Sequence, residues 1–164
     1  MNYEKRIEEL GITLPESSAP KAMYIPVKQV GNLLFVSGQL PCKLDGSLAY
    51  TGKLGDQLTL EQGQECARLC IINMLSALKY HLKDLDRVKN VVKLQAFVSS
   101  KTGFDQQHLV TNGASELLFD IFGEAGKHAR TAVGINQLPL DAPVEIEAIF
   151  DVSSFCTEPS SICF

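Results

Sequence analysis

The sequence predicts a mixed α+β protein, and three observations support this fold class. Helical and extended segments interleave in the order helix, two strands, helix, strand, helix, two strands. Each of the two long helical segments carries a single apolar stripe. The last two extended segments alternate, and the interleaved order favours a mixed sheet with the two long helices packed on one face. A length of 164 residues is typical of one domain, so we expect a single domain over 1–164, with an N-terminal helix and loop over 1–17 and a tail over 153–164.

Periodicity and turn signals place three helices and five strands. Thr59 and Gln62 have the spacing of a capping box at the start of the longest helix. Gly31-Asn32 separates two extended segments, and a Pro-rich turn over 138–143 separates two others, so we expect a hairpin at each end. The expected helices cover 3–10, 60–82 and 110–122, and a loop covers 11–21. The expected strands cover 24–30, 32–37, 88–98, 130–135 and 144–152.

Two long helices on one face of the sheet would leave its other face uncovered. An uncovered sheet face in a water-exposed protein is most simply explained by association with further copies of the chain.

Composition narrows the class of partner. The chain has 15 Lys and Arg against 19 Asp and Glu, a formal net charge of −4, which argues against a nucleic-acid binder held by bulk positive charge. No apolar run approaches the roughly 20 residues that span a bilayer. The charged N-terminal segment lacks the apolar stretch of a secretory signal. We therefore expect a cytoplasmic protein that binds no membrane, and the composition disfavours nucleic acid as a partner.

The five cysteines suggest neither a disulfide framework nor a zinc ribbon, because their number is odd and no C-x-x-C occurs. Cys66 and Cys70 share one helix face, where buried structural thiols are favoured over a metal site. Cys156 and Cys163 lie in the polar tail, and the sequence assigns them no role.

The segment Arg130–Ile135 contains the first candidate for chemistry. It alternates, so we expect its β-branched residues to face the helices and Arg130, Ala132 and Gly134 to point the other way. The two small residues would leave open volume beside a guanidinium, which is a planar fork suited to a carboxylate or phosphate. The alternative is an arginine on a solvated strand edge.

The last strand contains the second candidate. Glu145 and Glu147 share the face opposite its apolar residues, and we expect this to be the face that holds Arg130. A carboxylate near an arginine can orient or deprotonate water, and the alternative is a solvated ion pair of little energetic value.

The three histidines, His81, His108 and His128, form no recognisable set. Each is expected to be structural or solvated, although His128 lies two residues before Arg130 and so within reach of a site there. No phosphate-binding loop, dinucleotide fingerprint or zinc-protease motif is present.

Two segments together resemble the signatures of the YjgF/YER057c/UK-type family, also called the Rid or RidA family. Val30–Gln39 is similar to the first signature and the segment from Ala129 to Ala148 to the second. Tyr24 precedes Ser37 by thirteen residues and Glu145 follows Arg130 by fifteen, as in the family. The resemblance covers about residues 18–152 and is strongest to the longer subgroup.

The resemblance implies a chorismate-mutase-like α+β subunit, a homotrimer and clefts between adjacent subunits. It implies hydrolysis of reactive 2-imino or enamine acids to 2-keto acids and ammonia, with a small 2-imino or 2-keto acid as partner. Two alternatives stay open: a non-catalytic module that binds small carboxylates, and an endoribonuclease or translation inhibitor.

The resemblance also assigns roles to residues of the second signature. Arg130 would hold the substrate carboxylate with help from the backbone N–H of Ala132, and Glu145 would position the attacking water. Imines hydrolyse readily in water, so orientation and modest proton transfer suffice and neither a metal nor an organic cofactor is implied.

Residues of the first signature would complete the cleft. Tyr24 from the neighbouring subunit would help close the pocket, and Ser37 and Gly38 would line it. Residues 22–26 and 130–133 depart from the common family pattern, which leaves the identity of the substrate open.

Overall fold

The computed structural model of the protein describes residues 2–16 and 24–153 and confirms the α+β fold class. The loop expected over 11–21 is described only to residue 16 and the tail only at Ser153, so Cys156 and Cys163 lie outside the described residues. The helices are α1 (Tyr3–Glu9), α2 (Leu60–Leu82) and α3 (Gln107–Phe122). The strands are β1 (Val27–Val30), β2 (Leu33–Gln39), β3 (Val88–Ser99), β4 (Ala129–Ile135) and β5 (Val144–Val152).

The strands form one sheet in the order β1-β2-β5-β3-β4. The predicted N-terminal hairpin is confirmed, because β1 and β2 pair antiparallel around Gly31, whose φ of 59° suits glycine. The predicted C-terminal hairpin is wrong. β4 pairs parallel with β3, and β5 inserts between β2 and β3. The reason is that β3, α3 and β4 form a βαβ unit, while the apolar face of β5 is best buried at the sheet centre.

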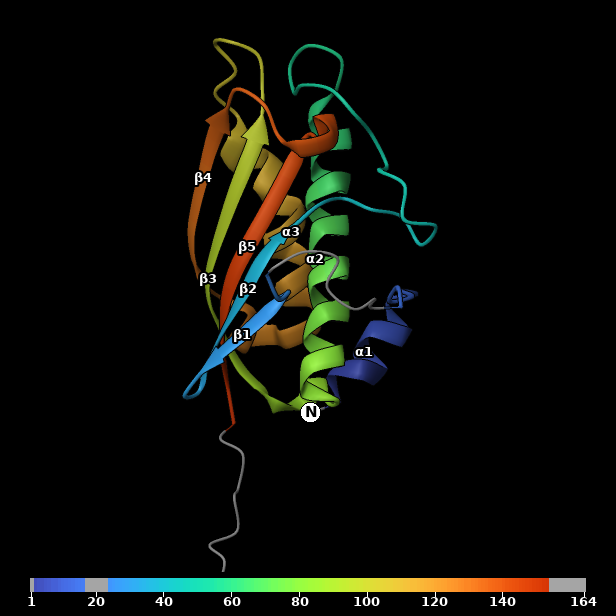
Figure 1. Ribbon diagram of the computed structural model, residues 1–164, viewed down its shortest axis with the longest axis vertical. Helices are drawn as coiled ribbons and strands as arrows, with labels where there is room; N and C mark the ends of the chain where they lie inside the picture. Colours follow the sequence, from blue (N-terminus) through green and yellow to red (C-terminus); the bar gives the residue numbers. More distant parts are fainter. Residues whose placement is uncertain (1, 17–23, 154–164) are drawn as a thin grey trace, which may run out of the picture.

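The long helices α2 and α3 cover one face of this sheet (Figure 1). The predicted capping box is confirmed: the Thr59 hydroxyl accepts from the Gln62 backbone N–H at 3.3 Å, and the Gln62 side chain accepts from the Thr59 N–H at 2.9 Å. Cys66 and Cys70 are buried thiols of α2, as expected, and burial raises the pKa of Cys66 to about 12. No helix of the described ranges combines the length and apolarity needed to cross a bilayer.

Strand β4 lies with its small residues toward α3, which contradicts the sequence expectation. In the register with β3, Arg130, Ala132 and Gly134 pair with core residues of the helix-covered face. A Cβ added at Gly134 would lie 2.7 Å from the Gln107 side chain of α3. Ala132 is partly buried against the core, and the Gln107 side chain of α3 leaves little room for a larger residue at position 134. The β-branched residues of β4 point to the uncovered face instead, where Val133 is 38% exposed.

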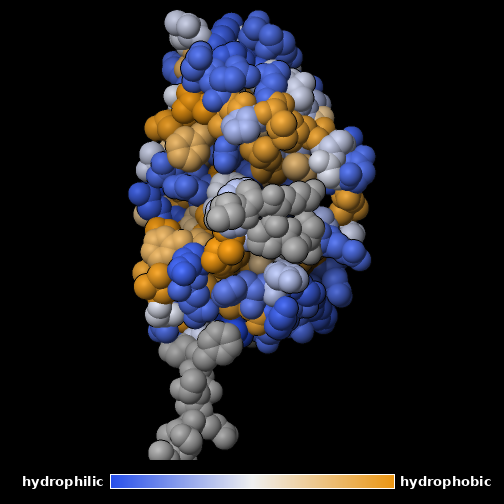
Figure 2. Space-filling model, viewed as in Figure 1, coloured by the Kyte–Doolittle hydropathy of each residue, from blue (hydrophilic) through white to orange (hydrophobic). Residues whose placement is uncertain are grey.

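The other sheet face has no helix over it in the described parts of the chain. Apolar side chains stand on it, including Phe35, which is 42% exposed, and Val30, which is 59% exposed. In the view of Figure 2, apolar side chains gather over the β1–β2 hairpin with hydrophilic side chains among them. The face is therefore too apolar for an ordinary solvated surface.

Candidate functional site

Arg130 is fixed to helix α3 by neutral hydrogen bonds. Its Nη1 donates to Asn112 Oδ1 at 2.9 Å and to Ser115 Oγ at 3.1 Å, and its Nη2 donates to the backbone oxygen of His108 at 3.2 Å. A guanidinium has five N–H groups. Three of them hold the helix, so the Nε–H and one Nη2–H are left to bind a ligand.

Within the described residues, no carboxylate forms a salt bridge with Arg130. The side chain is exposed and borders a hollow of about 290 Å³ between α3 and the start of β4. The hollow is lined by Ser115, Phe119, Gly126, Lys127, His128 and Arg130. A fixed cation without an acidic partner beside a hollow of this size suits a small anionic ligand.

His128 lies beside this arginine, at the junction between α3 and β4. Its Nδ1 is 2.6 Å from the backbone oxygen of Gly126, and its Nε2 is 3.0 Å from Ser115 Oγ. Burial lowers the pKa of His128, the Gly126 oxygen opposes this shift, and the nearby Arg130 adds to it. The expected proximity of His128 to Arg130 is thus present, through Ser115.

Glu145 lies on the opposite face of the sheet from Arg130. Glu145 and Glu147 share the uncovered face, where they pair with Phe97 and Gln95 of β3. The expectation that these carboxylates share a face with Arg130 is therefore wrong, because the small residues of β4 face the helices.

The carboxylate of Glu145 rests on the backbone of Gly38. A Cβ added at Gly38 would lie 2.0 Å from Glu145 Oε1, so only glycine accommodates this placement. Half-burial raises the pKa of Glu145, and the nearby Glu147 adds to the shift. No donor of the described residues reaches this carboxylate, which leaves its lone pairs open to water or a ligand.

Ser37 precedes Gly38 on β2 and is bonded to the segment that precedes β1. The Ser37 hydroxyl donates to the backbone oxygen of Ile25 at 2.9 Å, which joins β2 to the segment that carries Tyr24. The Tyr24 side chain is 64% exposed. Glu145 contacts Gly38, which follows Ser37, and Ser37 is bonded to Ile25, the residue after Tyr24. These four residues, Tyr24, Ser37, Gly38 and Glu145, are hereafter called the glutamate cluster.

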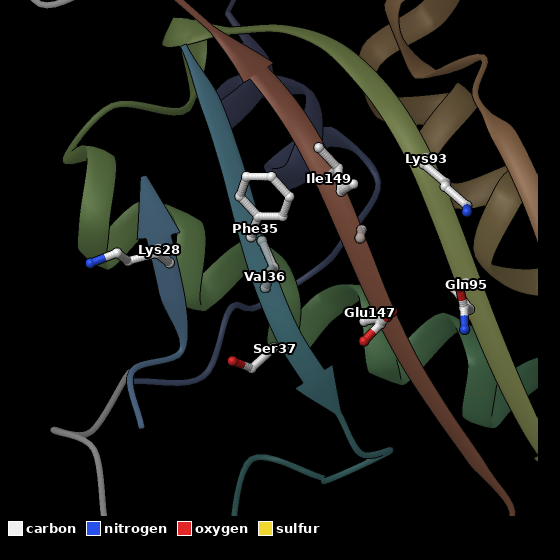
Figure 3. A pocket seen from close by; sticks show the side chains of 9 residues that line it. Lys28, Phe35, Val36, Ser37, Lys93, Gln95, Glu147 and Ile149 are labelled. Carbon is white, nitrogen blue, oxygen red and sulfur yellow. The ribbon is translucent and has the colours of Figure 1, made fainter. Parts of the chain in front are cut away.

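A hollow of about 310 Å³ lies on the uncovered face next to the glutamate cluster. Figure 3 shows Ser37 and Glu147 at one part of it and Phe35 with Ile149 at another, all in front of the strands while the helices lie behind. Lys28, Lys93 and Gln95 also border it. This hollow offers both charges and apolar surface on the side of the sheet away from Arg130.

Within one chain, the candidate residues on β4 lie far from those on β2. Arg130 and Ala132 lie on the edge strand β4, whereas Ser37 and Gly38 lie on β2, three strand spacings away. At a little under 5 Å per spacing the separation is about 14 Å, wider than a small acid. One chain therefore carries two partial sites.

The polar residues that hold Arg130 were not identified from the sequence. Asn112 and Ser115 lie three residues apart on α3 and so face the same direction. We call the residues around the guanidinium the arginine cluster, which consists of Arg130, Asn112, Ser115, His128 and the backbone oxygen of His108. The signal of Asn112 and Ser115 was available, because both are polar positions beside the buried apolar stripe of this helix.

Two long helices over one face of a five-stranded sheet, with polar clusters at separate places on it, define a chorismate-mutase-like α+β protein. Residues 4–151 match the family described as YjgF/chorismate-mutase-like with a proposed endoribonuclease activity. The chain belongs to this family.

Three similar proteins illustrate the range of the family. Protein TCP17 of Trypanosoma cruzi is 46% identical over 149 residues, which cover 90% of this chain and 92% of the relative. The crystal structure of Atu1372 from Agrobacterium tumefaciens, a protein of unknown function, is 45% identical, covers 93% of this chain and 94% of its own, and has a TM-score of 0.86. A 2-iminobutanoate/2-iminopropanoate deaminase of Dermatophagoides farinae is 25% identical over 138 residues, 84% of this chain and 92% of the relative.

Proposed function

We propose that the protein hydrolyses small 2-imino acids to 2-keto acids and ammonia, at a site completed by a second copy of the chain. The observation that carries this proposal is Arg130, held by neutral partners with two N–H groups left over. Two parallel N–H donors match the two oxygens of a carboxylate. The name of the deaminase relative supports the same substrate class.

Glu145 is the proposed group that prepares the water. Its carboxylate is half-buried, has a raised pKa and accepts no hydrogen bond from the described side chains or backbone. A carboxylate with free lone pairs can orient a water molecule and accept its proton. The water oxygen adds to the imine carbon, the imine nitrogen gains a proton, and the resulting carbinolamine releases ammonia and leaves the 2-keto acid.

The division of the candidate residues supports a shared site. Arg130 and Glu145 lie on opposite faces of the sheet, with β3 between their strands. A substrate with its carboxylate on Arg130 cannot also reach Glu145 of the same chain. The arginine cluster of one copy and the glutamate cluster of the next would together supply both groups, with Tyr24 closing the pocket.

The uncovered sheet face is the proposed contact between copies. Its exposed apolar side chains would be buried by association, which favours assembly at about 25 cal/mol per Å² of apolar surface. A ring of three copies, as the family resemblance implies, would place one shared site at each contact. Sedimentation at several protein concentrations measures the assembly.

The decisive experiment measures the loss of 2-iminopropanoate or 2-iminobutanoate generated in solution, with and without the protein. The wild type should accelerate hydrolysis and Arg130→Ala should abolish the acceleration. Lys127→Ala is the matched control, because it removes a cation of the same hollow that is paired with Glu124 at 2.8 Å. Equal rates for Arg130→Ala and wild type would contradict the proposal.

A second candidate is a module that binds a small carboxylate without turning it over. The observation that favours it is the position of Glu145 on the far face from Arg130 in the same chain. Tight binding of a 2-keto acid without accelerated imine hydrolysis would establish this function instead. Endoribonuclease activity has less support, because a chain with a net charge of −4 offers little to the phosphate backbone of RNA.

A further inference from the structure

We propose that His128 is a positioning residue that acts through Ser115 to hold Arg130 in place for the substrate carboxylate. This inference rests on the proposed function of Arg130 and extends it to two residues that the imine chemistry does not use. It is carried by an unbroken chain of contacts from the Gly126 backbone oxygen through His128 and Ser115 to the guanidinium.

The donor and the acceptor of each hydrogen bond in this series can be assigned by starting from the backbone oxygen at one end. A backbone oxygen only accepts, so the imidazole Nδ1 that lies 2.6 Å from the Gly126 oxygen carries a proton. In the neutral ring Nε2 then has only a lone pair, and the Ser115 hydroxyl donates to it across 3.0 Å. The serine oxygen is left with lone pairs alone, and one of them accepts from Arg130 Nη1 at 3.1 Å.

The surroundings favour the neutral ring that this arrangement needs. The ring is partly buried, and both burial and the guanidinium of Arg130 oppose protonation. Lys127, the other cation among the residues that line the hollow, is paired with Glu124 at 2.8 Å. An acidic partner that would stabilise an imidazolium is therefore not among these neighbours.

Among the three acceptors of Arg130, Ser115 is the one that depends on another side chain. The His108 backbone oxygen and the Asn112 amide oxygen can accept whatever the state of their neighbours. A hydroxyl rotates, so Ser115 without His128 can turn its proton toward the guanidinium. His128 removes this freedom, which keeps the unused edge of the guanidinium aimed at the hollow.

A double-mutant cycle on the binding of pyruvate, a small 2-keto acid, tests the inference. We expect Ser115→Ala and His128→Phe each to weaken pyruvate binding about fivefold. The double variant should be no weaker than Ser115→Ala alone, because His128 acts only through Ser115. His128→Gln, whose amide can both donate and accept, should recover most of the affinity. His81→Gln is the control, since His81 contacts Gln29 on another part of the sheet.

Heteronuclear NMR of the imidazole nitrogens in the wild type supplies a readout that needs neither turnover nor a variant that folds. We expect neutral His128 with its proton on Nδ1 in the wild type. Where the Ser115→Ala variant also folds, the signal of Nε2 should change. A proton on Nε2, or losses that multiply in the double variant, would overturn the role of His128.

The same measurements separate this inference from the proposed function. If wild type binds pyruvate and His128→Phe binds it equally well, only the positioning role is refuted. If wild type binds no 2-keto acid, carboxylate recognition by Arg130 is refuted and the positioning role goes with it.

Discussion

The arginine cluster and the glutamate cluster are organised in opposite ways. Arg130 makes three hydrogen bonds to α3 and keeps a fixed orientation before any ligand arrives. Glu145 is held by its fit against Gly38 and receives no hydrogen bond from the described residues. The part suited to binding is preorganised, while the part suited to reaction keeps its oxygen atoms free. This difference implies that the two clusters make separable contributions to binding and to rate.

After the complete loss expected of Arg130→Ala, the largest effect on rate is expected of Glu145→Gln. If Glu145 prepares the water as proposed, its loss should lower kcat by about 100-fold or more, the usual range for a lost general base. Pyruvate affinity should stay close to that of wild type, because Arg130 and its partners are untouched. Steady-state rates with generated imine, together with calorimetric binding of pyruvate, provide the comparison. A parallel loss of both quantities would show that the two clusters do not divide the work.

Mixing two inactive variants tests whether the clusters meet across copies. Arg130→Ala chains retain Glu145, and Glu145→Gln chains retain Arg130. After co-refolding in equal amounts, about a quarter of the contacts should pair one intact half with the other. Imine hydrolysis should rise accordingly above that of either variant alone. Activity that stays at the level of the separate variants would place both groups in the same copy.

Gly38→Ala is expected to displace the Glu145 carboxylate without removing its charge. The added methyl would overlap Oε1, which lies at the end of a flexible side chain, and the backbone needs no left-handed conformation at this position. Activity should fall by about tenfold, whereas stability should change by less than about 1 kcal/mol. Imine-hydrolysis assays and urea unfolding of the same variant separate the two effects. A large loss of stability without displacement of the carboxylate would contradict the role given to Gly38.

Asn112→Ala should loosen Arg130 by one hydrogen bond. Two partners on α3 remain, so pyruvate affinity should fall about fivefold, as expected for one hydrogen bond to a charged group. The value of kcat at saturation should hold. Gln64→Ala is a matched control, since its amide bonds the Leu109 backbone oxygen elsewhere on α3.

The smallest expected effect is a pH-dependent change in stability. Because burial raises the native pKa of Glu145 above its ordinary value of 4.5, the native state binds this proton more tightly than the unfolded state. Stability therefore falls as pH rises from about 4.5 through the native pKa, and Glu145→Gln removes this loss. Between acid and neutral pH, the free energy of unfolding of the variant should rise by roughly 0.5 kcal/mol relative to that of wild type. This value is reduced because the Glu145 side chain is partly exposed. Urea unfolding at both pH values measures it.

The sequence predicted the helices better than the strand neighbours. The apolar stripes and the capping box of α2 depend on residues close in sequence, and these predictions are confirmed. The C-terminal hairpin was inferred from a Pro-rich turn. A connection of six residues does not require the two strands that it joins to pair with each other. The succession of β3, α3 and β4 was the better signal, since it is typical of parallel pairing.

The face of β4 was assigned wrongly for a packing reason. Alternation gives two faces but not which of them is buried, and larger apolar side chains were expected to be the buried ones. Ala132 is partly buried against the core, and a Cβ at Gly134 would meet the Gln107 side chain of α3. These are tertiary contacts that periodicity cannot show. The candidates Tyr24, Ser37 and Gly38 were predicted from the family resemblance, and of these the structure places Gly38 in contact with Glu145.

The strand order carries a consequence for synthesis. β5 is the last strand to leave the ribosome, yet it is the middle strand of the sheet. Until residue 144 emerges, the nascent chain holds two separate strand pairs, β1 with β2 and β3 with β4, whose inner edges have no partner. Long-range pairing of this kind slows folding and exposes strand edges to other chains. The final nine-residue strand thus joins the two halves of the molecule in a single late event.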